Sequence, residues 1–315
     1  MADVGTVDVH THPIPPFLRE ALLAAGRSPS LSGFPDWSPD LALQFMDEFG
    51  IVRSIVSVST PGVHFGDDAA ARALARRYNE YCAGLKDGHP GRFGMFAALP
   101  LPDVDGACRE ACHALDVLKA EGVGLLASYG EEFLGTPAFD PLMAELDARG
   151  ALVFVHPAGH PSSRALATGT PLWMVEYPVD TTRAAVNLIM TGTTRRYKRI
   201  RFILAHNGGT LPFLAWRLSA APLIDTRYAH MDEAGIRAEI ARFFYEIAQS
   251  PGPEAFGSLL RVTSPDHILF GTDWPYCSPR VVQHLEQSFR SLDLDDATRA
   301  AVRHGNAARL EASPA

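Results

Sequence analysis

Two histidines, His10 and His12, lie at the end of the first apolar run of the sequence, in the pattern Asp8-Val9-His10-Thr11-His12. Side chains alternate between the two faces of a β-strand, so two histidines separated by one residue project from the same face. Two imidazoles on one face can bind a borderline divalent ion such as Zn²⁺. The same spacing also occurs by chance in tails and loops. The position of this pair at a strand end favours a metal site.

Two further polar residues, His156 and Asp273, also close apolar runs. His156 follows residues 151–155, which carry no polar side chain, and Asp273 closes the run that begins at Ile268. A carboxylate in such a place is costly to bury unless it is paired or metal-bound. Each residue alone has a simpler interpretation, a hydrogen-bonded core histidine for His156 and a helix cap for Asp273. Together with His10 and His12, they predict one metal site with an open position for water or substrate.

A fourth histidine, His206, closes residues 200–205 and is followed by Asn207-Gly208-Gly209. We interpret His206 as an acid or base beside the metal, able to deprotonate metal-bound water or to stabilise an anion, rather than as a fifth ligand. A purely structural, hydrogen-bonded histidine is the alternative. The residues alone do not separate these two roles.

The lysines of the chain bear on the number of metal ions. Binuclear barrel hydrolases commonly bridge two ions with a carbamylated lysine at the end of the fourth strand. The chain contains only Lys86, Lys119 and Lys198, and none of them closes a predicted strand. The sequence therefore predicts a single ion.

These residues need elements that bring them together, and the sequence alternates short β-branched runs with amphipathic segments. Eight strands are predicted: Val4–His10, Ile51–Val58, Phe93–Ala98, Val123–Ala127, Leu152–His156, Ile200–His206, Phe243–Ile247 and Ile268–Asp273. The helix-to-strand connections are short, whereas residues 13–37 and 157–178 form long strand-to-helix loops, which are usually functional. We expect one (β/α)8 barrel spanning residues 1–315, with its site at the carboxyl ends of the strands. A doubly wound open sheet is the alternative, but the chain lacks the GxGxxG turn of dinucleotide-binding folds.

The composition restricts the partners. The chain has 315 residues, of which 47% are hydrophobic and 20% charged, with a net charge of −8. That balance is globular rather than disordered. Phosphate binding needs a basic stripe, so we expect neither nucleic acid nor an anionic membrane as a partner. The sequence shows no apolar run of about 18 residues and no signal-peptide pattern, which predicts a cytoplasmic protein.

The order of these motifs resembles the amidohydrolase superfamily. The segments DVHTH, HP after the fifth strand, AHNGG and FGTDWP are similar to the branch that contains aminocarboxymuconate-semialdehyde decarboxylase and the metal-dependent ortho-hydroxybenzoate decarboxylases. The likeness runs from Val7 to about Leu310. Within this branch, segments such as RFGMFAALPLPDVDGA and HNGGTLPFLAWRL are most similar to the decarboxylases of 6-methylsalicylate.

The resemblance implies a site and a partner. One divalent ion, zinc or manganese, would be held by His10, His12, His156 and Asp273, and His206 would be the catalytic histidine. Some manganese-dependent relatives begin with a glutamate where this chain has His10, which mildly favours zinc. The resemblance also implies a homodimer.

The implied activity is the nonoxidative decarboxylation of an ortho-hydroxybenzoate such as 6-methylsalicylate, which would release CO₂ and 3-methylphenol. The proton for the ring carbon could come from Asp273, or from His206 through bound water. A metal-dependent hydrolase of a lactone or amide is the alternative on the same barrel, and a barrel that keeps its metal without catalysis is a third. Four aromatic residues are candidates for the substrate pocket, although each could simply pack in the core: Phe65, Tyr129, Trp173 and Trp274.

Overall fold

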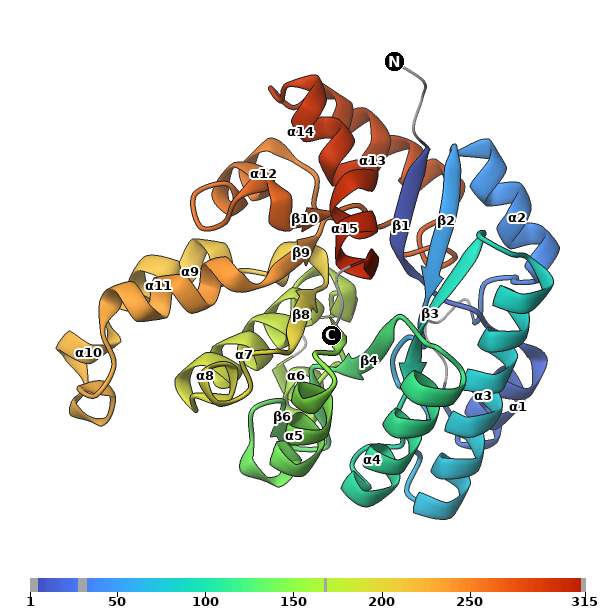
Figure 1. Ribbon diagram of the computed structural model, residues 1–315, viewed down its shortest axis with the longest axis horizontal. Helices are drawn as coiled ribbons and strands as arrows, with labels where there is room; N and C mark the ends of the chain where they lie inside the picture. The colour runs from blue at the N-terminus through green and yellow to red at the C-terminus, as the bar shows by residue number, and fades with distance from the viewer. Residues whose placement is uncertain (1–4, 28–32, 167–168, 313–315) are drawn as a thin grey trace.

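Eight parallel strands form the centre of the computed structural model, which describes residues 5–27, 33–166 and 169–312 (Figure 1). Neighbours along the sheet follow the order β1-β2-β3-β4-β7-β8-β9-β10. The strands are β1 Thr6–Thr11, β2 Ile51–Val56, β3 Phe93–Ala98, β4 Gly122–Leu126, β7 Leu152–His156, β8 Arg201–Leu204, β9 Phe244–Glu246 and β10 Ile268–Leu269. Together with the surrounding helices, this order confirms the predicted (β/α)8 barrel.

The barrel is closed by backbone contacts between β1 and the chain that follows β10. The N–H of Val9 donates to the carbonyl of Phe270 at 3.0 Å, and the N–H of Asp273 donates to the carbonyl of His10 at 2.8 Å. Asp8, fully buried, reinforces this seam, because its carboxylate accepts the N–H and the hydroxyl of Thr272. These hydrogen bonds therefore fix β1 relative to the segment after β10, at the end of the barrel where the histidines lie.

Helices surround the strands (Figure 1). The longer ones are α1 Pro16–Ala24, α2 Pro39–Glu48, α3 Asp68–Gly88, α4 Val104–Cys112, α5 Asp140–Ala148, α7 Glu176–Met190, α9 Leu211–Ser219, α11 Glu233–Arg242 and α13 Pro279–Ser291. The shorter ones are α6 Pro161–Leu166, α8 Thr193–Arg196, α10 Ala221–Ile224, α12 Pro253–Leu259, α14 Asp296–Ala300 and α15 Asn306–Ala312. None of the described helices has the length and apolarity needed to cross a bilayer.

The C-terminal helix lies at the amino-terminal ends of the strands. Ala307 and Leu310 of α15 join a buried cluster that also contains Val7 and Phe154 from the barrel. Arg201, the first residue of β8, donates to the carbonyl of Leu310 at 3.0 Å. This packing leaves the opposite, carboxyl ends of the strands for the site.

The two long connections contain more regular structure than predicted. Helix α1 lies within residues 13–37, and α6 and a short 3₁₀ turn, Leu172–Met174, lie within residues 157–178. Several strands are also shorter than predicted, since β10 ends at Leu269, four residues before Asp273. Val4, the predicted start of the first strand, lies outside the described residues. A hairpin of β5 Ser128–Tyr129 and β6 Glu132–Phe133 was not predicted.

Candidate metal centre

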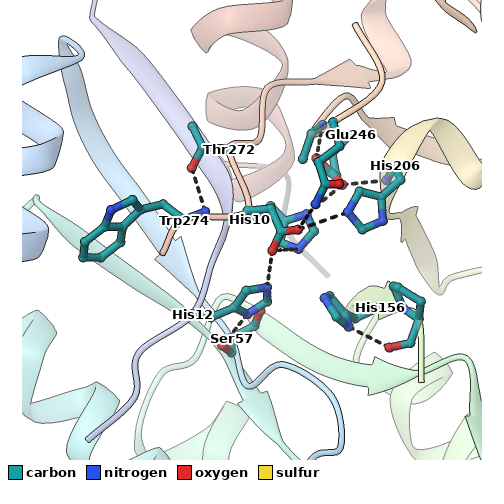
Figure 2. Close-up of polar contacts among 12 residues, drawn as sticks. His10, His12, Ser57, His156, His206, Glu246, Thr272 and Trp274 are labelled. Carbon is teal, nitrogen blue, oxygen red and sulfur yellow. Dashed lines mark hydrogen bonds and ion pairs between the residues drawn. The ribbon is translucent and has the colours of Figure 1, made fainter. Parts of the chain in front are cut away.

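The four predicted ligands meet at the carboxyl ends of β1, β7 and β10, and Figure 2 shows the three histidines turned toward one another. His10 lies on β1 and His156 is the last residue of β7, while His12 and Asp273 follow β1 and β10. One ligand atom from each of the four lies within 4.8 Å of the others. All four side chains are buried. Residues separated by more than 260 positions in the sequence thus form one compact cluster.

The hydrogen bonds of the three imidazoles fix which nitrogen carries the proton. His12 Nδ1 donates to the carbonyl of Ser57 at 3.0 Å, and His156 Nδ1 donates to the carbonyl of Pro157 at 2.8 Å. His10 Nδ1 donates to the carboxylate of Glu246 at 2.7 Å. A neutral imidazole has one N–H, so in each ring Nε2 carries a bare lone pair.

These Nε2 atoms and Asp273 present acceptors to one another with no proton between them. His12 Nε2 lies 3.1 Å and His10 Nε2 lies 3.5 Å from Asp273 Oδ1. Both nitrogens are buried without a hydrogen-bond donor of their own. Converging lone pairs repel unless a cation lies among them, and three imidazoles with one carboxylate form an ordinary donor set for a divalent ion. The cluster therefore fits a divalent metal site.

The charges around the cluster favour a cation. Burial would raise the pKa of Asp273, but His10 and His12 hold it well below its ordinary value. Burial would likewise raise the pKa of Glu246, which the neighbouring His10 lowers. Burial lowers the pKa of His156 well below its ordinary value, and nearby His12 and His10 add to this effect. Burial would lower the pKa of His10, but Glu246 and Asp273 outweigh burial and raise that pKa to about 9. The two buried carboxylates therefore favour a positive charge among the imidazoles, whether a proton or a metal ion.

His206 lies next to the cluster rather than within it. It begins the 3₁₀ turn His206–Gly208 directly after β8, in a left-handed backbone conformation with φ +55°. Its Nε2 atom lies 3.4 Å from Asp273 Oδ2, on the side of the carboxylate away from Oδ1. Its Nδ1 atom is buried without a hydrogen-bond partner. This side chain is therefore placed to exchange a proton with a molecule bound beside the ligands.

Two residues of the site were missed by the sequence analysis, and both lie at the end of β9. Glu246 contacts His10, and the side-chain amide of Gln249 donates to Asp273 Oδ2. Glu246 could have been found by the argument that identified Asp273, because it places a carboxylate inside the apolar run 243–247. No sequence signal indicated Gln249. Its left-handed backbone, with φ +57°, is visible only in the structure.

A cavity of about 430 Å³ lies at the carboxyl ends of β2, β3, β4 and β7, the same end of the barrel as the cluster. Its lining includes Val58, close to Ser57, and Ala158, close to His156. The lining is partly apolar, with Pro61, Val63, Leu99, Leu101, Leu126 and Pro161. It also contains polar side chains, from Arg27, Thr60, His64 and Ser128. The cavity therefore offers a largely uncharged space at the same end of the barrel as the metal site.

Of the four aromatic candidates for the pocket, Phe65 and Tyr129 line this cavity, and the two tryptophans do not. Trp274 stacks on Phe45, with ring centroids 4.9 Å apart, and points away from the histidines (Figure 2). Asp273, the residue before Trp274, has a left-handed backbone with φ +60°, and its carboxylate and the indole point in different directions. Trp173 lies on the turn before α7 and is 54% exposed. Its ring lies on the surface because the long connection is folded into short helices.

Known proteins are similar to this chain over most of its length. A family model described as amidohydrolase matches residues 7–310. The 6-methylsalicylic acid decarboxylase of Aspergillus aculeatus is 40% identical over 279 residues, which cover 85% of this chain and 84% of that protein. The enzyme of the same name from Penicillium expansum is 33% identical over 311 residues, covering 98% and 96%.

Solved structures show the same fold with a metal bound. The crystal structure of a dihydroxybenzoic acid decarboxylase from a Polaromonas species, with manganese and the inhibitor 2-nitroresorcinol, aligns with a TM-score of 0.82 at 25% identity. The alignment covers 98% of this chain and 96% of that one.

Proposed function

Because this chain belongs to the amidohydrolase family, as a carboxy-lyase of its decarboxylase branch, we propose that it decarboxylates 6-methylsalicylate to 3-methylphenol and CO₂. The observation that carries the proposal is the convergence of His10, His12 and His156 with Asp273, at the end of the barrel that also holds the cavity. Such a site suits an aromatic acid whose two ortho oxygens both need a cation. Similarity to 6-methylsalicylic acid decarboxylases over most of the chain supports the choice of substrate.

The reaction replaces a carbon–carbon bond by a carbon–hydrogen bond. A proton adds to the ring carbon that bears the carboxylate, the bond to the carboxylate carbon then breaks, and its electron pair restores the aromatic ring. CO₂ leaves, and no oxidant or reductant is needed. When bound, the divalent ion would supply a Lewis acid for the phenolate and carboxylate oxygens of the substrate.

We assign the delivery of the proton to His206. Both oxygens of Asp273 already have neighbours, since Oδ1 faces the imidazoles of His10 and His12 while Oδ2 faces His206 and Gln249. His206, in contrast, has a buried Nδ1 atom without a partner. His206 can therefore donate a proton from Nδ1 to the substrate, while its Nε2 atom stays in contact with Asp273.

The cavity would receive the arene. An apolar cavity of roughly 150 Å³ is enough for benzene, so the 430 Å³ here holds one aromatic ring with room for a substituent. Phe65 and Tyr129 would then lie along the ring. A methyl group contributes about 0.8 kcal/mol when it is buried, or about fourfold in kcat/KM. Plain salicylate is therefore expected to react more slowly than 6-methylsalicylate.

The test is CO₂ release from 6-methylsalicylate, salicylate and 4-hydroxybenzoate under matched conditions. We expect 3-methylphenol from the first, slower turnover of the second, and no reaction of the third, because a para hydroxyl cannot reach an ion that already binds the carboxylate. Equal turnover of all three would contradict chelation by ortho oxygens.

Hydrolysis of a lactone or amide is the second candidate, because the same ligands can activate water. The panel should therefore include lactones of aromatic acids. Hydrolysis of a lactone, with no CO₂ from any of the acids, would replace the decarboxylase by the hydrolase.

We also propose zinc as the resident ion, with manganese as the alternative. Three imidazole nitrogens and one carboxylate suit zinc, whereas the Polaromonas relative holds manganese. Elemental analysis of protein purified without added metal distinguishes the two.

A homodimer is proposed from the resemblance and from an exposed apolar surface. Helices α9 and α10 project from the barrel at the left of Figure 1. Phe213, Trp216, Leu223 and Ile224 on these helices are 70–84% exposed. Large exposed apolar patches commonly mark contact sites. We expect light scattering to give twice the mass of one chain, and Trp216→Glu to shift the protein toward the monomer.

We propose a cytoplasmic location. The four cysteines are free thiols, the form that a reducing compartment maintains. Fractionation of cells that express the protein would test this location.

A further inference from the structure

The carboxylate of Glu246 accepts hydrogen bonds from three different groups at the end of β9. Its Oε1 atom accepts the Nδ1–H of His10 and the backbone N–H of His206, each at 2.7 Å (Figure 2). Its Oε2 atom accepts the backbone N–H of Ala248, also at 2.7 Å. The side chain is fully buried. A single carboxylate thus contacts both a metal ligand and the histidine assigned to proton transfer.

We propose that Glu246 is a positioning residue that turns the bare Nε2 of His10 toward the metal and, through the same oxygen, holds His206 at its place beside Asp273. The inference rests on the proposed function of the site, because it assigns His10 to the metal and His206 to the proton. It adds that the two roles are joined by one oxygen atom. Disturbing Glu246 should therefore weaken metal binding and turnover together.

The tautomer of His10 depends on this contact. An imidazole can place its single proton on either nitrogen, and only the form with the proton on Nδ1 leaves Nε2 free for a cation. A carboxylate at 2.7 Å from Nδ1 selects that form and makes the opposite nitrogen a stronger donor to a metal. His12 and His156 have only backbone carbonyls at Nδ1, so His10 alone has a charged partner.

The backbone of His206 depends on the same oxygen. Its φ of +55° lies in the left-handed region, which is unfavourable for a residue with a side chain and persists only where the surroundings hold it. The contact from its N–H to Glu246 is one such restraint. A neutral amide in place of the carboxylate would provide only one acceptor atom for these three donors, so at least one bond would be lost.

Asp8 shows that burial of a carboxylate does not by itself produce this role. It is also fully buried, but among the described residues its hydrogen bonds come from the backbone N–H of His10 and from both donors of Thr272, not from a ligand imidazole. Asp8 therefore shapes the backbone at the seam of β1 and β10. Glu246 acts on a ligand side chain. Gly271 leaves space for it, since a Cβ atom there would lie 2.2 Å from Glu246 Oε2.

The test compares Glu246→Gln and Glu246→Asp with Glu110→Gln. Glu110 is a suitable control, because it is buried on α4 outside the cluster, where it accepts the side-chain amide of Asn79 at 2.8 Å and pairs with Arg76. Each Gln variant removes one buried negative charge. The full-length proteins are stripped of metal and titrated with Zn²⁺ against a competing chelator, and turnover is then measured with saturating metal.

For Glu246→Gln we expect 10- to 100-fold weaker Zn²⁺ affinity, the usual effect of losing a carboxylate behind a metal-binding histidine, and lower kcat even when metal is saturating. Glu246→Asp keeps the charge on a shorter side chain and should recover part of the affinity. Glu110→Gln should keep its affinity within about twofold of the wild type. The ¹⁵N shifts of the His10 ring in the zinc-loaded protein should show the Nδ1–H tautomer in the wild type.

Unchanged affinity in Glu246→Gln would overturn the proposal, and so would equal losses in Glu246→Gln and Glu110→Gln. If Glu246→Gln does not fold, Glu246→Asp decides, and full wild-type affinity and kcat in that variant would count against a positioning role. These outcomes are separate from the proposed function. A wild-type protein that binds zinc but releases no CO₂ refutes the decarboxylase, and the affinity comparison still stands.

Discussion

The side chains of His206 and Asp273 meet across 3.4 Å, from Nε2 of the imidazole to Oδ2 of the carboxylate. Asp273 therefore has two distinct sides, since its Oδ1 atom faces His10 and His12. In the proposed site, one carboxylate would therefore both hold the metal and orient the acid/base histidine. This arrangement predicts that removing the histidine and removing the carboxylate have different effects.

Loss of a ligand should remove the metal. We expect one divalent ion per chain in the wild type. We expect almost none in His10→Ala or Asp273→Ala, because each substitution removes one of the four proposed ligands. Elemental analysis after dialysis measures this. His230→Ala, at an exposed histidine on the surface, is the control and should keep one ion per chain. Two ions in the wild type would disprove the single site.

Loss of His206 should leave the metal in place and reduce turnover. The His206→Ala variant keeps all four ligands, so we expect wild-type metal content together with a decrease in kcat of about 10²- to 10⁴-fold, the usual contribution of an acid/base group. Metal content and kcat are measured on the same preparation. Loss of the metal in this variant would show that His206 is a ligand.

The position of the new hydrogen in the product reports the protonation step. In D₂O, the proton carried by His206 exchanges with solvent, so the 3-methylphenol formed from 6-methylsalicylate should carry one deuterium at the carbon that bore the carboxylate. Mass spectrometry and proton NMR measure the amount and the position. 3-Methylphenol incubated with the enzyme in D₂O for the same time is the control for slow exchange. Product without deuterium would rule out a solvent-exchangeable donor.

The free energy of unfolding should depend on pH through Asp103, which follows the cavity residue Pro102 and precedes α4. Its carboxylate caps α4 by accepting the N–H of Gly106 at 3.0 Å, and it pairs with Arg72 at 2.6 Å. Burial would raise the pKa of Asp103, but these two partners outweigh burial and lower it. A carboxyl with a lowered pKa stabilises the folded state above its unfolded pKa of about 4, and this contribution is lost as the pH falls through the folded pKa.

Asp103→Asn should therefore unfold at lower urea concentration than the wild type at pH 7, with the gap narrowing below about pH 4. Asp103→Ala removes the cap as well and should lower the free energy of unfolding by about 1 kcal/mol at pH 7. Since we propose that residues 1–315 form one domain, each variant should show a single transition. A gap that stays constant down to acid pH would exclude the ionised carboxylate as its source.

The sequence predicted the four residues that the structure brings together, because they lie at the ends of apolar runs, where burial makes a polar group costly unless it has a partner. It did not reveal the hydrogen bonds that select the ligand nitrogens. The partners of His12 and His156 are backbone carbonyls, and a carbonyl leaves no mark on residue identity. The same limit applies to Gln249, whose approach to Asp273 depends on a backbone turn.

The aromatic residues show a second limit. Phe65 and Trp274 are equally plausible pocket residues in the sequence, and only the direction of each side chain decides between the cavity and the packing against Phe45. The long connections were predicted as loops because short helices such as α6 have too few residues for a clear period.

The metal ligands and the cavity come from different parts of the barrel. The proposed ligands and most of the groups that orient them lie on or just after β1, β7, β8, β9 and β10, with the Ser57 carbonyl after β2 as the exception. Most of the cavity is built by segments that follow β2, β3 and β4. Substitutions after β2 to β4 can therefore alter which ring fits while the reacting end stays intact. Relatives with new substrate preferences can arise by substitutions in the segments after β2, β3 and β4, without passing through an inactive ancestor.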